Sequence, residues 1–486
     1  MKKIVSLVLL LTMLVSLVAC GSNPTPTTTP ANPTDPTGTV TEGAKANFDV
    51  PEGGYDGSDV TIKFYHTMGS NLVAVLETYI EEFNKLYPNI HIEHSSVGGY
   101  DDVRDQISTE ITVGNQPNIA YCYPDHVALY NLAKAVVSMD NLIDSQIEVQ
   151  RADGSTEVLG LTEEQKSDFI AGYYNEGRQF GDGLMYTLPL SKSTEVLYYN
   201  KTFFEENGLT VPTTWDEMAD TCAKIKAISP NSIPLGYDSE SNWFITMCEQ
   251  QGSDYTSATG DHYLFNNDQN KAFVKQFRDW YKKGYLTTQT LYGSYTSGLF
   301  KSTEEVKSYM SIGSSAGAVH QRPAPDANGD YPFDVGIATI PQVSADNAKV
   351  ISQGPSLCIF QKKNPQEVIA SWLFVKFLAT NVEFQAEFSM ASGYVPVLKS
   401  VAQNPVYAEF LANADGGAYI SALSAKVCLE QESAYYTSPA FNGSSTARSQ
   451  VGALMSQCLV ADDKGDVDGM IDKAFQNAID ECEYNG

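Results

Sequence analysis

The sequence predicts a globular α/β protein built from two sets of alternating strands and helices. In the first set, period-two apolar runs at 60–65 and 90–94 flank a helical stripe at 71–87. A second set begins near residue 184. The order strand–helix–strand favours parallel sheets covered by helices. Two such sets leave a crevice between them at the carboxyl ends of the strands, which is where ligands bind in open α/β sheets.

Local patterns assign the elements of each set. The helix at 71–87 ends where Pro88 would remove a helical hydrogen bond. In the second set, Thr214 and Glu217 form a capping-box pattern at the start of a helix at 215–228. The other predicted elements are strands at 119–123, 195–200, 308–312, 334–340 and 356–360, a helix at 101–113, and a mostly helical C-terminal third from residue 365.

The composition narrows the functional class. The chain has 486 residues, of which 42% are hydrophobic and 19% charged, and this balance is typical of a folded globular protein rather than a disordered or polytopic membrane protein. At ~150 residues per domain, this length predicts two or three domains. The 59 acidic and 31 basic residues give a formal charge of −28. Because such a surface repels phosphate backbones, nucleic acid is not an expected partner.

The N-terminus predicts export and a lipid anchor. Two lysines precede an apolar run at 4–19, which is shorter than the ~20 residues of a membrane-spanning helix and suits a signal peptide at 1–19. The run ends at Cys20 in a pattern that resembles a bacterial lipobox. That resemblance implies cleavage before Cys20 and acylation of its thiol, with palmitate as an expected modification. The alternative is an ordinary signal peptide with an incidental cysteine.

Residues 20–58 are expected to form a tether that starts at the lipidated cysteine. Five prolines and eight threonines lie between residues 23 and 41, where no apolar period is present. Such a segment cannot form a core. Anchor and tether together would hold a globular domain, residues 59–486, at the extracellular face of the bacterial cell membrane.

The seven cysteines that follow Cys20 show neither a CxxC motif nor a metal-binding spacing. Cys358 lies in a buried-strand pattern and is expected to be a small core residue. Because seven is odd, at least one thiol is free or pairs between chains, and one disulfide among the later cysteines stays open as an alternative. No metal and no cofactor are expected.

One local motif raises the question of catalysis. Residues 313–317 read Gly-Ser-Ser-Ala-Gly after a predicted strand, the setting in which Ser315 would be a nucleophile. That chemistry needs a histidine later in the chain, and only His320, five residues on, follows Ser315. The preferred interpretation is a helix start whose N–H groups and hydroxyls hold a ligand oxygen. A surface-anchored hydrolase of polysaccharides or esters is the alternative.

Six segments, taken in order, resemble the family 1 extracellular solute-binding proteins, the binding components of bacterial carbohydrate importers driven by ATP. The most recognisable segment is 188–201, which reads LPLSKSTEVLYYNK. The others are 64–69, 203–217, 311–317, 352–356 and 392–397. Within this family, the chain most resembles the glycerol-3-phosphate-binding group.

The resemblance implies an α/β, two-lobed, periplasmic-binding-protein-like fold with a ligand cleft between the lobes and crossover hinge strands. One lobe would hold about 59–185 and 350–385, and the other about 190–340 and 390–486. Ligand would close the lobes by hinge motion, because it touches both lobes only in the closed state. The closed protein would deliver its ligand to the permease subunits of an ABC importer, as a monomer and without making or breaking bonds. A sensor or adhesin that uses the same fold without transport is a further alternative.

The resemblance also implies a set of cleft residues. They combine hydroxyls and a carboxylate for ligand hydroxyl groups, aromatic rings for sugar faces, and a glycine for close backbone approach. The ligand-binding candidates are His66, Tyr100, Asp125, Ser193, Trp243, Ser314, Ser315, Gly354, Tyr394 and Phe441.

One departure from the glycerol-phosphate group bears on the ligand. That group carries an arginine for the phosphate before a late glycine, and here Phe441 stands at that place in 440–443. Arg448 lies seven residues further on and is not expected to replace it. Without a forked cation, a buried phosphate loses its strongest hydrogen bonds. The sequence therefore favours a neutral mono- or oligosaccharide, while Lys192 and Lys201 keep glycerol 3-phosphate or a phosphodiester as the alternative.

Overall fold

The computed structural model describes residues 44–413, 419–462 and 464–485. The predicted signal peptide, Cys20 and most of the predicted tether lie outside the described residues. All described residues belong to a unit that spans residues 41–486. Within them, no helix combines the length and the apolarity needed to cross a bilayer.

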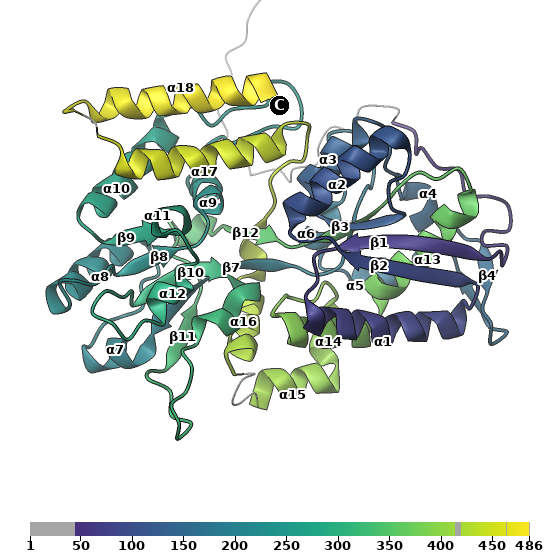
Figure 1. Ribbon diagram of the computed structural model, residues 1–486, viewed down its shortest axis with the longest axis horizontal. Coiled ribbons are helices and arrows are strands. Elements are labelled where there is room, and N and C mark those ends of the chain that lie inside the picture. The colour runs from purple at the N-terminus through teal and green to yellow at the C-terminus, as the bar shows by residue number, and fades with distance from the viewer. Residues whose placement is uncertain (1–43, 414–418, 463, 486) are drawn as a thin grey trace, which may run out of the picture. The chain divides into compact units, whose positions relative to one another are not determined.

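The first sheet has five strands in the order β2-β1-β3-β13-β6. β1 is parallel to β2 and β3, whereas β13 is antiparallel to β3 and β6. Alternate residues of β3 face opposite sides, so Ile119 and Tyr121 join the core beneath α1 and α13, while Ala120 and Cys122 join the core beneath α2 and α3 (Figure 1). The strands are β1 Val60–His66, β2 Ile90–Ser96, β3 Ile119–Cys122, β6 Leu188–Pro189 and β13 Ser356–Ile359.

The helices of this part follow the predicted apolar stripes. α1 ends just before Pro88, and α3 begins with Pro124 at its first position, where the missing N–H has no intrahelical partner to lose. The helices and short strands here are α1 Ser70–Leu86, α2 Tyr100–Val113, α3 Pro124–Asn131, α4 Asp140–Ile143, β4 Glu148–Gln150, β5 Thr156–Val158, α5 Glu163–Asp168, α6 Ala171–Glu176, α13 Pro365–Thr380, α14 Val382–Ser392, η3 Lys399–Gln403 and α15 Pro405–Asn413.

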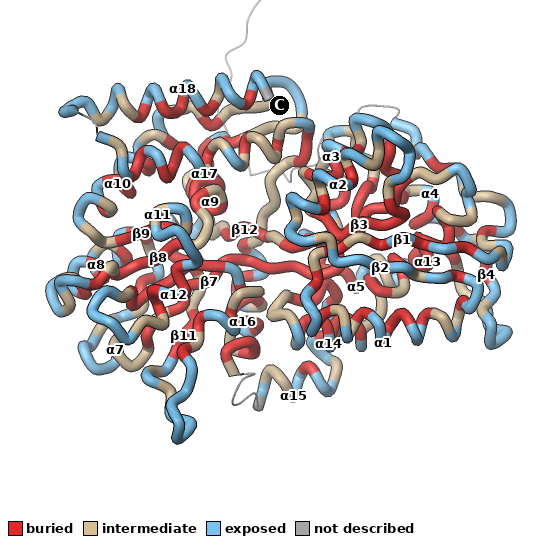
Figure 2. Tube along the Cα trace, in the orientation of Figure 1, coloured by how far each residue is buried: buried red, intermediate tan, exposed pale blue. Residues whose placement is uncertain are grey.

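The second sheet runs β14-β12-β7-β10-β8-β9, with β11 paired to β7 as well. β7 is the spine of this sheet, and Figure 2 shows it buried along nearly its whole length. Its strands are β7 Ser193–Asn200, β8 Leu235–Tyr237, β9 Leu286–Thr288, β10 Met310–Ser314, β11 Val335–Ala338, β12 Val350–Gln353 and β14 Tyr435–Tyr436.

Two core clusters cover the two faces of β7. Leu197 joins the cluster formed by α8, α9, α10, α17 and α18, while Val196 and Tyr198 join the cluster on the side of α16. The predicted capping box of α8 is present, since Thr214 Oγ1 accepts from the Glu217 amide. The helices are α7 Lys201–Glu206, α8 Trp215–Ile228, α9 Glu240–Gln251, α10 Asp268–Lys282, α11 Gln289–Tyr292, α12 Ser297–Phe300, η1 Ser315–Gln321, η2 Ala345–Asn347, α16 Tyr419–Glu430, η5 Glu432–Ala434, α17 Ser444–Val460 and α18 Val467–Asn485.

The chain crosses between the two sheets at neighbouring points. Residues 190–192 join β6 to β7, and residues 354–355 join β12 to β13. A third crossing segment, 393–398, is bridged to the first through Lys192 and Val395. These crossings are the places where the two lobes can bend relative to each other.

The segment before β1 differs from the tether prediction. Phe48 is buried in the first core, the Asn47 amide donates to Ser138 Oγ at 2.8 Å, and the Asp56 amide donates to Gln366 Oε1 at 3.0 Å. The prediction that the tether extends to residue 58 is therefore wrong for 47–58. Composition alone missed this, because a single aromatic residue is enough to fix a short segment to an existing core.

Two predicted lobe boundaries also differ from the structure. β12 pairs with β7 and so belongs to the second sheet, although residues 350–385 were assigned to the first lobe. Val397, Leu398 and Tyr407 lie in the first core, although 390–486 was assigned to the second lobe. Strand patterns identify an element but not the sheet it joins, which explains both errors.

The seven cysteines among the described residues are all free and buried, as predicted for Cys358. Cys122 and Cys358, on neighbouring strands, have their Sγ atoms 3.6 Å apart. Burial raises the pKa of the Cys122 thiol well above its usual value, so this thiol is neutral at physiological pH.

Candidate functional site

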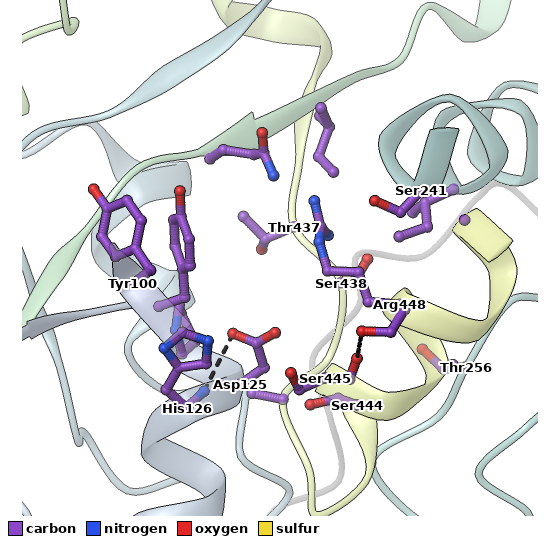
Figure 3. A pocket seen from close by; sticks show the side chains of 18 of the residues that line it. Tyr100, Asp125, His126, Ser241, Thr256, Thr437, Ser438, Ser444, Ser445 and Arg448 are labelled. Atoms are coloured by element: carbon purple, nitrogen blue, oxygen red, sulfur yellow. Dashed lines mark hydrogen bonds between the residues drawn. The ribbon is translucent and has the colours of Figure 1, made fainter. Parts of the chain in front are cut away.

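A cavity of about 980 Å³ lies at the edges of both sheets and is the candidate functional site (Figure 3). One wall comes from the start of α2 and from the turn between β3 and α3. The opposite wall comes from α9 and the first turns of α17. Residues 351–354, at the crossing from β12 to β13, also line it. The site therefore draws on parts of the chain that belong to different sheets.

Aromatic rings shape the first wall. The Tyr100 and Tyr123 rings lie with centroids 4.2 Å apart, and the Oη atoms of Tyr100 and Tyr394 are 3.3 Å apart. Tyr100 is held in place because it starts α2, whose N-terminal Gly99 amide donates to Asp102 Oδ2 at 2.8 Å. These rings present an apolar surface edged by hydroxyl groups, which suits a polyol or sugar ring.

Asp125 and His126 follow Tyr123 on the same wall. Asp125 is half-buried, and its Oδ1 accepts from the His126 amide at 3.2 Å, which leaves Oδ2 available for ligand hydroxyl groups. Burial lowers the pKa of His126, which is 3% exposed, against the raising effect of Asp125. Its Nδ1 has no hydrogen-bond partner among the described residues. A neutral imidazole beside a carboxylate can donate to or accept from a ligand hydroxyl group.

The second wall is a helix N-terminus with hydroxyl groups and a cation. α17 starts after Gly443, which has φ +97° and provides no side-chain cap, and its first turn contains no acidic residue. Ser444, Ser445 and Arg448 line the cavity from this helix, since positions i and i+4 share a face. The free amides, the helix dipole and the arginine all favour an anionic group at this wall.

Arg448 is held from behind by a buried polar network. Its Nη2 donates to Asn242 Oδ1, which also accepts from Gln353 Nε2 at 3.0 Å. Asn242 Nδ2 donates to Glu195 Oε1 at 3.0 Å and to Gln353 Oε1 at 2.7 Å. Tyr237 Oη completes the network by donating to Glu195 Oε2 at 2.6 Å. The side chain of Arg448 is therefore positioned before any ligand arrives.

A buried ion pair joins the cavity to the crossing strands. Glu176 lines the cavity and pairs with Lys192, which lies between β6 and β7 and is fully buried. Lys192 Nζ also donates to the Gly354 carbonyl and to Ser356 Oγ, each at 3.1 Å. Gly354 has φ +108°, and a Cβ there would lie 2.6 Å from the Ser191 carbonyl oxygen, so only glycine fits this close approach.

Comparison with known proteins identifies the family. The family model of the bacterial extracellular solute-binding proteins matches residues 78–414. The chain belongs to the bacterial extracellular solute-binding protein family. The family predicted from the sequence motifs is thus confirmed, and with it the function of a solute-binding protein of ABC importers. Members of this family bind solutes and are not enzymes.

Individual relatives agree with this assignment. The sn-glycerol-3-phosphate-binding periplasmic protein UgpB of Escherichia coli (strain K12) is 26% identical over 361 residues, covering 70% of this chain and 75% of the relative. UgpB of Salmonella typhimurium is also 26% identical, covering 69% and 74%.

Solved structures confirm the two-lobed α/β fold. UgpB from Mycobacterium tuberculosis, in complex with glycerophosphocholine, has a TM-score of 0.67 at 17% identity and covers 87% of this chain and 98% of its own. The cyclic alpha-maltosyl-1,6-maltose binding protein from Arthrobacter globiformis has a TM-score of 0.67 at 19% identity, covering 88% and 100%.

Three of the ten predicted cleft residues of this solute-binding protein line the cavity, namely Tyr100, Asp125 and Gly354. A fourth, Tyr394, lies behind Tyr100 and contacts it through their hydroxyl groups. The structure thus brings together the predicted residues at the starts of α2 and α3 and in the crossing segments.

Two predicted aromatic contacts lie elsewhere. Trp243 is fully buried in the second core, where its ring stacks on Tyr237 at 4.8 Å and lies 4.2 Å from Phe277. Phe441 lines a separate cavity of about 480 Å³ and stacks on His262 at 4.6 Å. Both rings pack against other rings, a role that the sequence does not distinguish from ligand stacking.

His66 is also placed in the interior of the protein. It is fully buried at the end of β1, where its Nδ1 accepts from the Met68 amide at 3.1 Å and its Nε2 lies 3.0 Å from His94 Nδ1. Burial lowers the pKa of His66 to about 4. Its role in the structure is to fix the loop after β1.

The serine candidates fix backbone rather than line the cavity. Ser193 is buried in β7, opposite Gln353 of β12. Ser314 caps η1, and the buried Ser315 accepts from the Thr194 amide at 3.2 Å. His320, the histidine required by the hydrolase alternative, is exposed whereas Ser315 is buried, so the two do not form a catalytic pair.

The cationic wall was not predicted from the sequence. Arg448 was not expected to serve the site, but α17 begins at Ser444 and places Arg448 one turn inside the helix, where it lines the cavity. The signal was present in the sequence, since a glycine followed by two serines is a good helix start. The argument from Phe441 for a neutral ligand did not include a cation on the cavity wall, and Arg448 is one.

Proposed function

We propose that this protein captures a small polyol that carries a phosphate, either glycerol 3-phosphate or a glycerophosphodiester, and delivers it to an ABC importer. The observation that carries this proposal is Arg448, which is held at the uncapped N-terminus of α17 on the wall of the cavity. The names of two relatives, the glycerol-3-phosphate-binding UgpB and the UgpB solved with glycerophosphocholine, support the same ligand class.

The two walls suit the two ends of such a ligand. Arg448 can form charge-assisted bonds to phosphate oxygens, and Ser445 adds a hydroxyl donor at the start of the same helix, whereas the Ser444 hydroxyl and amide already donate to the Phe441 carbonyl. Asp125 and Tyr100, on the other wall, suit the hydroxyl groups of the glycerol moiety. Because the ligand contacts both walls together only when the lobes approach, its binding favours lobe closure about the crossing strands.

A neutral oligosaccharide is the second candidate. The Tyr100 and Tyr123 rings and the carboxylate of Asp125 favour it, because sugars bind through stacked rings and hydroxyl-to-carboxylate hydrogen bonds. The solved cyclic alpha-maltosyl-1,6-maltose binding protein has the same fold and binds a carbohydrate, as its name states. A neutral ligand would bring no negative charge to Arg448.

A thermal-shift screen of the purified protein distinguishes the candidates. The ligands are glycerol 3-phosphate, glycerophosphocholine, maltose and maltotriose, and inorganic phosphate is the control for the anion alone. A ligand at 100 times its Kd stabilises the folded state by about 2.7 kcal/mol, which is a shift of several degrees. We expect shifts with the glycerophosphates. Shifts with the neutral sugars alone would contradict the phosphate proposal and support the oligosaccharide.

We also propose that Cys20 carries the lipid anchor and that the following tether holds a monomeric binding protein at the outer face of the membrane. In the Cys20→Ser variant, we expect the protein to move from the membrane fraction to the soluble or culture fraction, because the acylated thiol is lost. The Cys122→Ser variant is the control and should stay with the membrane. Retention of Cys20→Ser in the membrane fraction would contradict the anchor.

A further inference from the structure

A buried carboxyl group lies directly behind the cationic wall of the cavity and does not line it. Glu195, in the middle of β7, is 1% exposed. It is joined to the cavity through Asn242, which bonds to Glu195 with its amide nitrogen and to Arg448 with its amide oxygen. Two hydrogen bonds therefore connect a carboxyl group in the core to the arginine that faces the ligand.

We propose that Glu195 is a positioning residue that couples the binding of an anionic ligand at Arg448 to the uptake of one proton from solvent by its carboxyl group. This inference rests on the phosphate-binding function proposed above. In the free protein above neutral pH, the carboxylate is mostly ionised and balances the charge of Arg448. In the complex, the ligand phosphate balances Arg448 instead, and Glu195 becomes a neutral carboxylic acid. The only covalent bond that forms is the O–H bond of the Glu195 carboxyl group.

The surroundings of Glu195 make this exchange feasible. Burial raises the pKa of Glu195 to about 7, while hydrogen bonds from Tyr237 and Asn242 and the charge of Arg448 oppose the rise. Asp238, at the end of β8, adds a further raising effect, and Tyr436 of β14 is close enough for Glu195 to affect its pKa. The carboxyl group is therefore close to half-protonated at neutral pH, where a modest change in its field alters its charge.

The direction of the pH dependence follows from the charges. A bound phosphate cancels the favourable effect of Arg448 and adds a negative charge nearby, so the pKa of Glu195 is higher in the complex than in the free protein. The complex then holds more protons than the free protein between these two pKa values. By linkage, affinity rises as the pH falls through this window and levels off on either side of it.

Glycerophosphocholine is the probe for the test, because its phosphodiester and quaternary ammonium groups do not titrate near neutral pH. Calorimetric titration at pH 7.5, in two buffers with different heats of ionisation, measures the protons taken up. We expect an uptake of about 0.3 to 0.7 proton at pH 7.5 and a rise in affinity of about three- to tenfold from pH 8.5 to pH 6.5.

Two variants separate this inference from a purely structural role. Glu195→Gln keeps the shape and a carbonyl acceptor but cannot titrate, so its affinity should be independent of pH and its proton uptake zero. Asp238→Asn is the matched control. Burial also raises the pKa of the Asp238 carboxyl group, but this group accepts a hydrogen bond from the Thr296 amide at 2.6 Å and is not bonded to the Arg448 network. The affinity of this variant should still depend on pH, but over a slightly lower pH range, because the raising effect of Asp238 on the pKa of Glu195 is lost.

Each outcome decides between the two proposals. If glycerophosphocholine fails to bind at every pH tested, the phosphate-binding function is overturned and this inference falls with it. If glycerophosphocholine binds with an affinity that does not change with pH and without proton uptake, only the role of Glu195 is overturned. If the affinity of Glu195→Gln still depends on pH, another group takes up the proton, and the proposed role of Glu195 is also overturned.

Discussion

Replacing Arg448 with methionine is expected to weaken the binding of glycerophosphocholine by about thirtyfold or more, because removing one partner of a desolvated charge pair costs about 2–5 kcal/mol. Arg448 is half-buried, and Asn242 already directs its guanidinium toward the cavity. Methionine keeps much of the volume of the side chain but removes the charge and all five donors. Calorimetric titration of the purified variant at pH 7 gives the change in Kd directly.

Two further substitutions give this prediction its controls. Arg448→Lys keeps the positive charge and loses the planar fork, so its affinity should lie between those of the wild type and Arg448→Met. Lys201→Met removes one of the two lysines that the sequence suggested for an anionic ligand, but Lys201 lies on α7 beside Glu205 and does not line the cavity. It should bind like the wild type. Unchanged binding in Arg448→Met would place the phosphate elsewhere or exclude it.

The order of the elements was predictable because it is encoded over short distances. The alternation of apolar residues in β1, the stripe of α1 and the Thr214–Glu217 capping box each depend on residues within a few positions of one another. The sheet to which β12 belongs was not predictable. That assignment depends on pairing with β7, more than 150 residues earlier in the chain, and no local pattern records it.

The site was predictable only where it follows directly from the ends of strands. Tyr100 and Asp125 follow β2 and β3, and Gly354 lies at a crossing between strands, and all three predicted residues line the cavity. Arg448 was missed because its position depends on the residue at which α17 begins. Trp243 was assigned to the ligand because an aromatic residue early in a helix fits a core and a binding site equally well, and only the packing of Tyr237 and Phe277 decides between them.

The network behind Arg448 shows what sequence motifs omit. Glu195 lies within the most recognisable family segment, but the motif does not tell whether its carboxylate reaches the ligand or another side chain. In the structure it is bonded to Tyr237 and Asn242, which come from a strand and a helix that lie 42 and 47 residues further along the chain. The function of such a residue depends on the fold as a whole, since only the fold brings its partners together.

The Lys192–Glu176 pair supports the second large prediction. Lys192→Met is expected to lower the free energy of unfolding by about 3–5 kcal/mol, because it leaves the buried carboxylate of Glu176 without its counter-ion. The substitution also removes the donor to the Gly354 carbonyl and to Ser356 Oγ. Urea denaturation of the purified variant, followed by tryptophan fluorescence and far-UV circular dichroism, measures the change.

A double-mutant cycle separates loss of the pair from loss of packing. In Lys192→Met with Glu176→Gln, no unpaired charge remains, so most of the lost stability should return, since replacing both members of a buried pair is often nearly neutral. If the single variant were as stable as the wild type, Glu176 would not be an unpaired charge after the substitution.

The cycle also bears on binding, because Glu176 lines the cavity while Lys192 lies on the crossing strand. A ligand that contacts Glu176 therefore acts on the same group that fixes the hinge, and Glu176→Gln should alter both the affinity and the stability of the ligand-free protein.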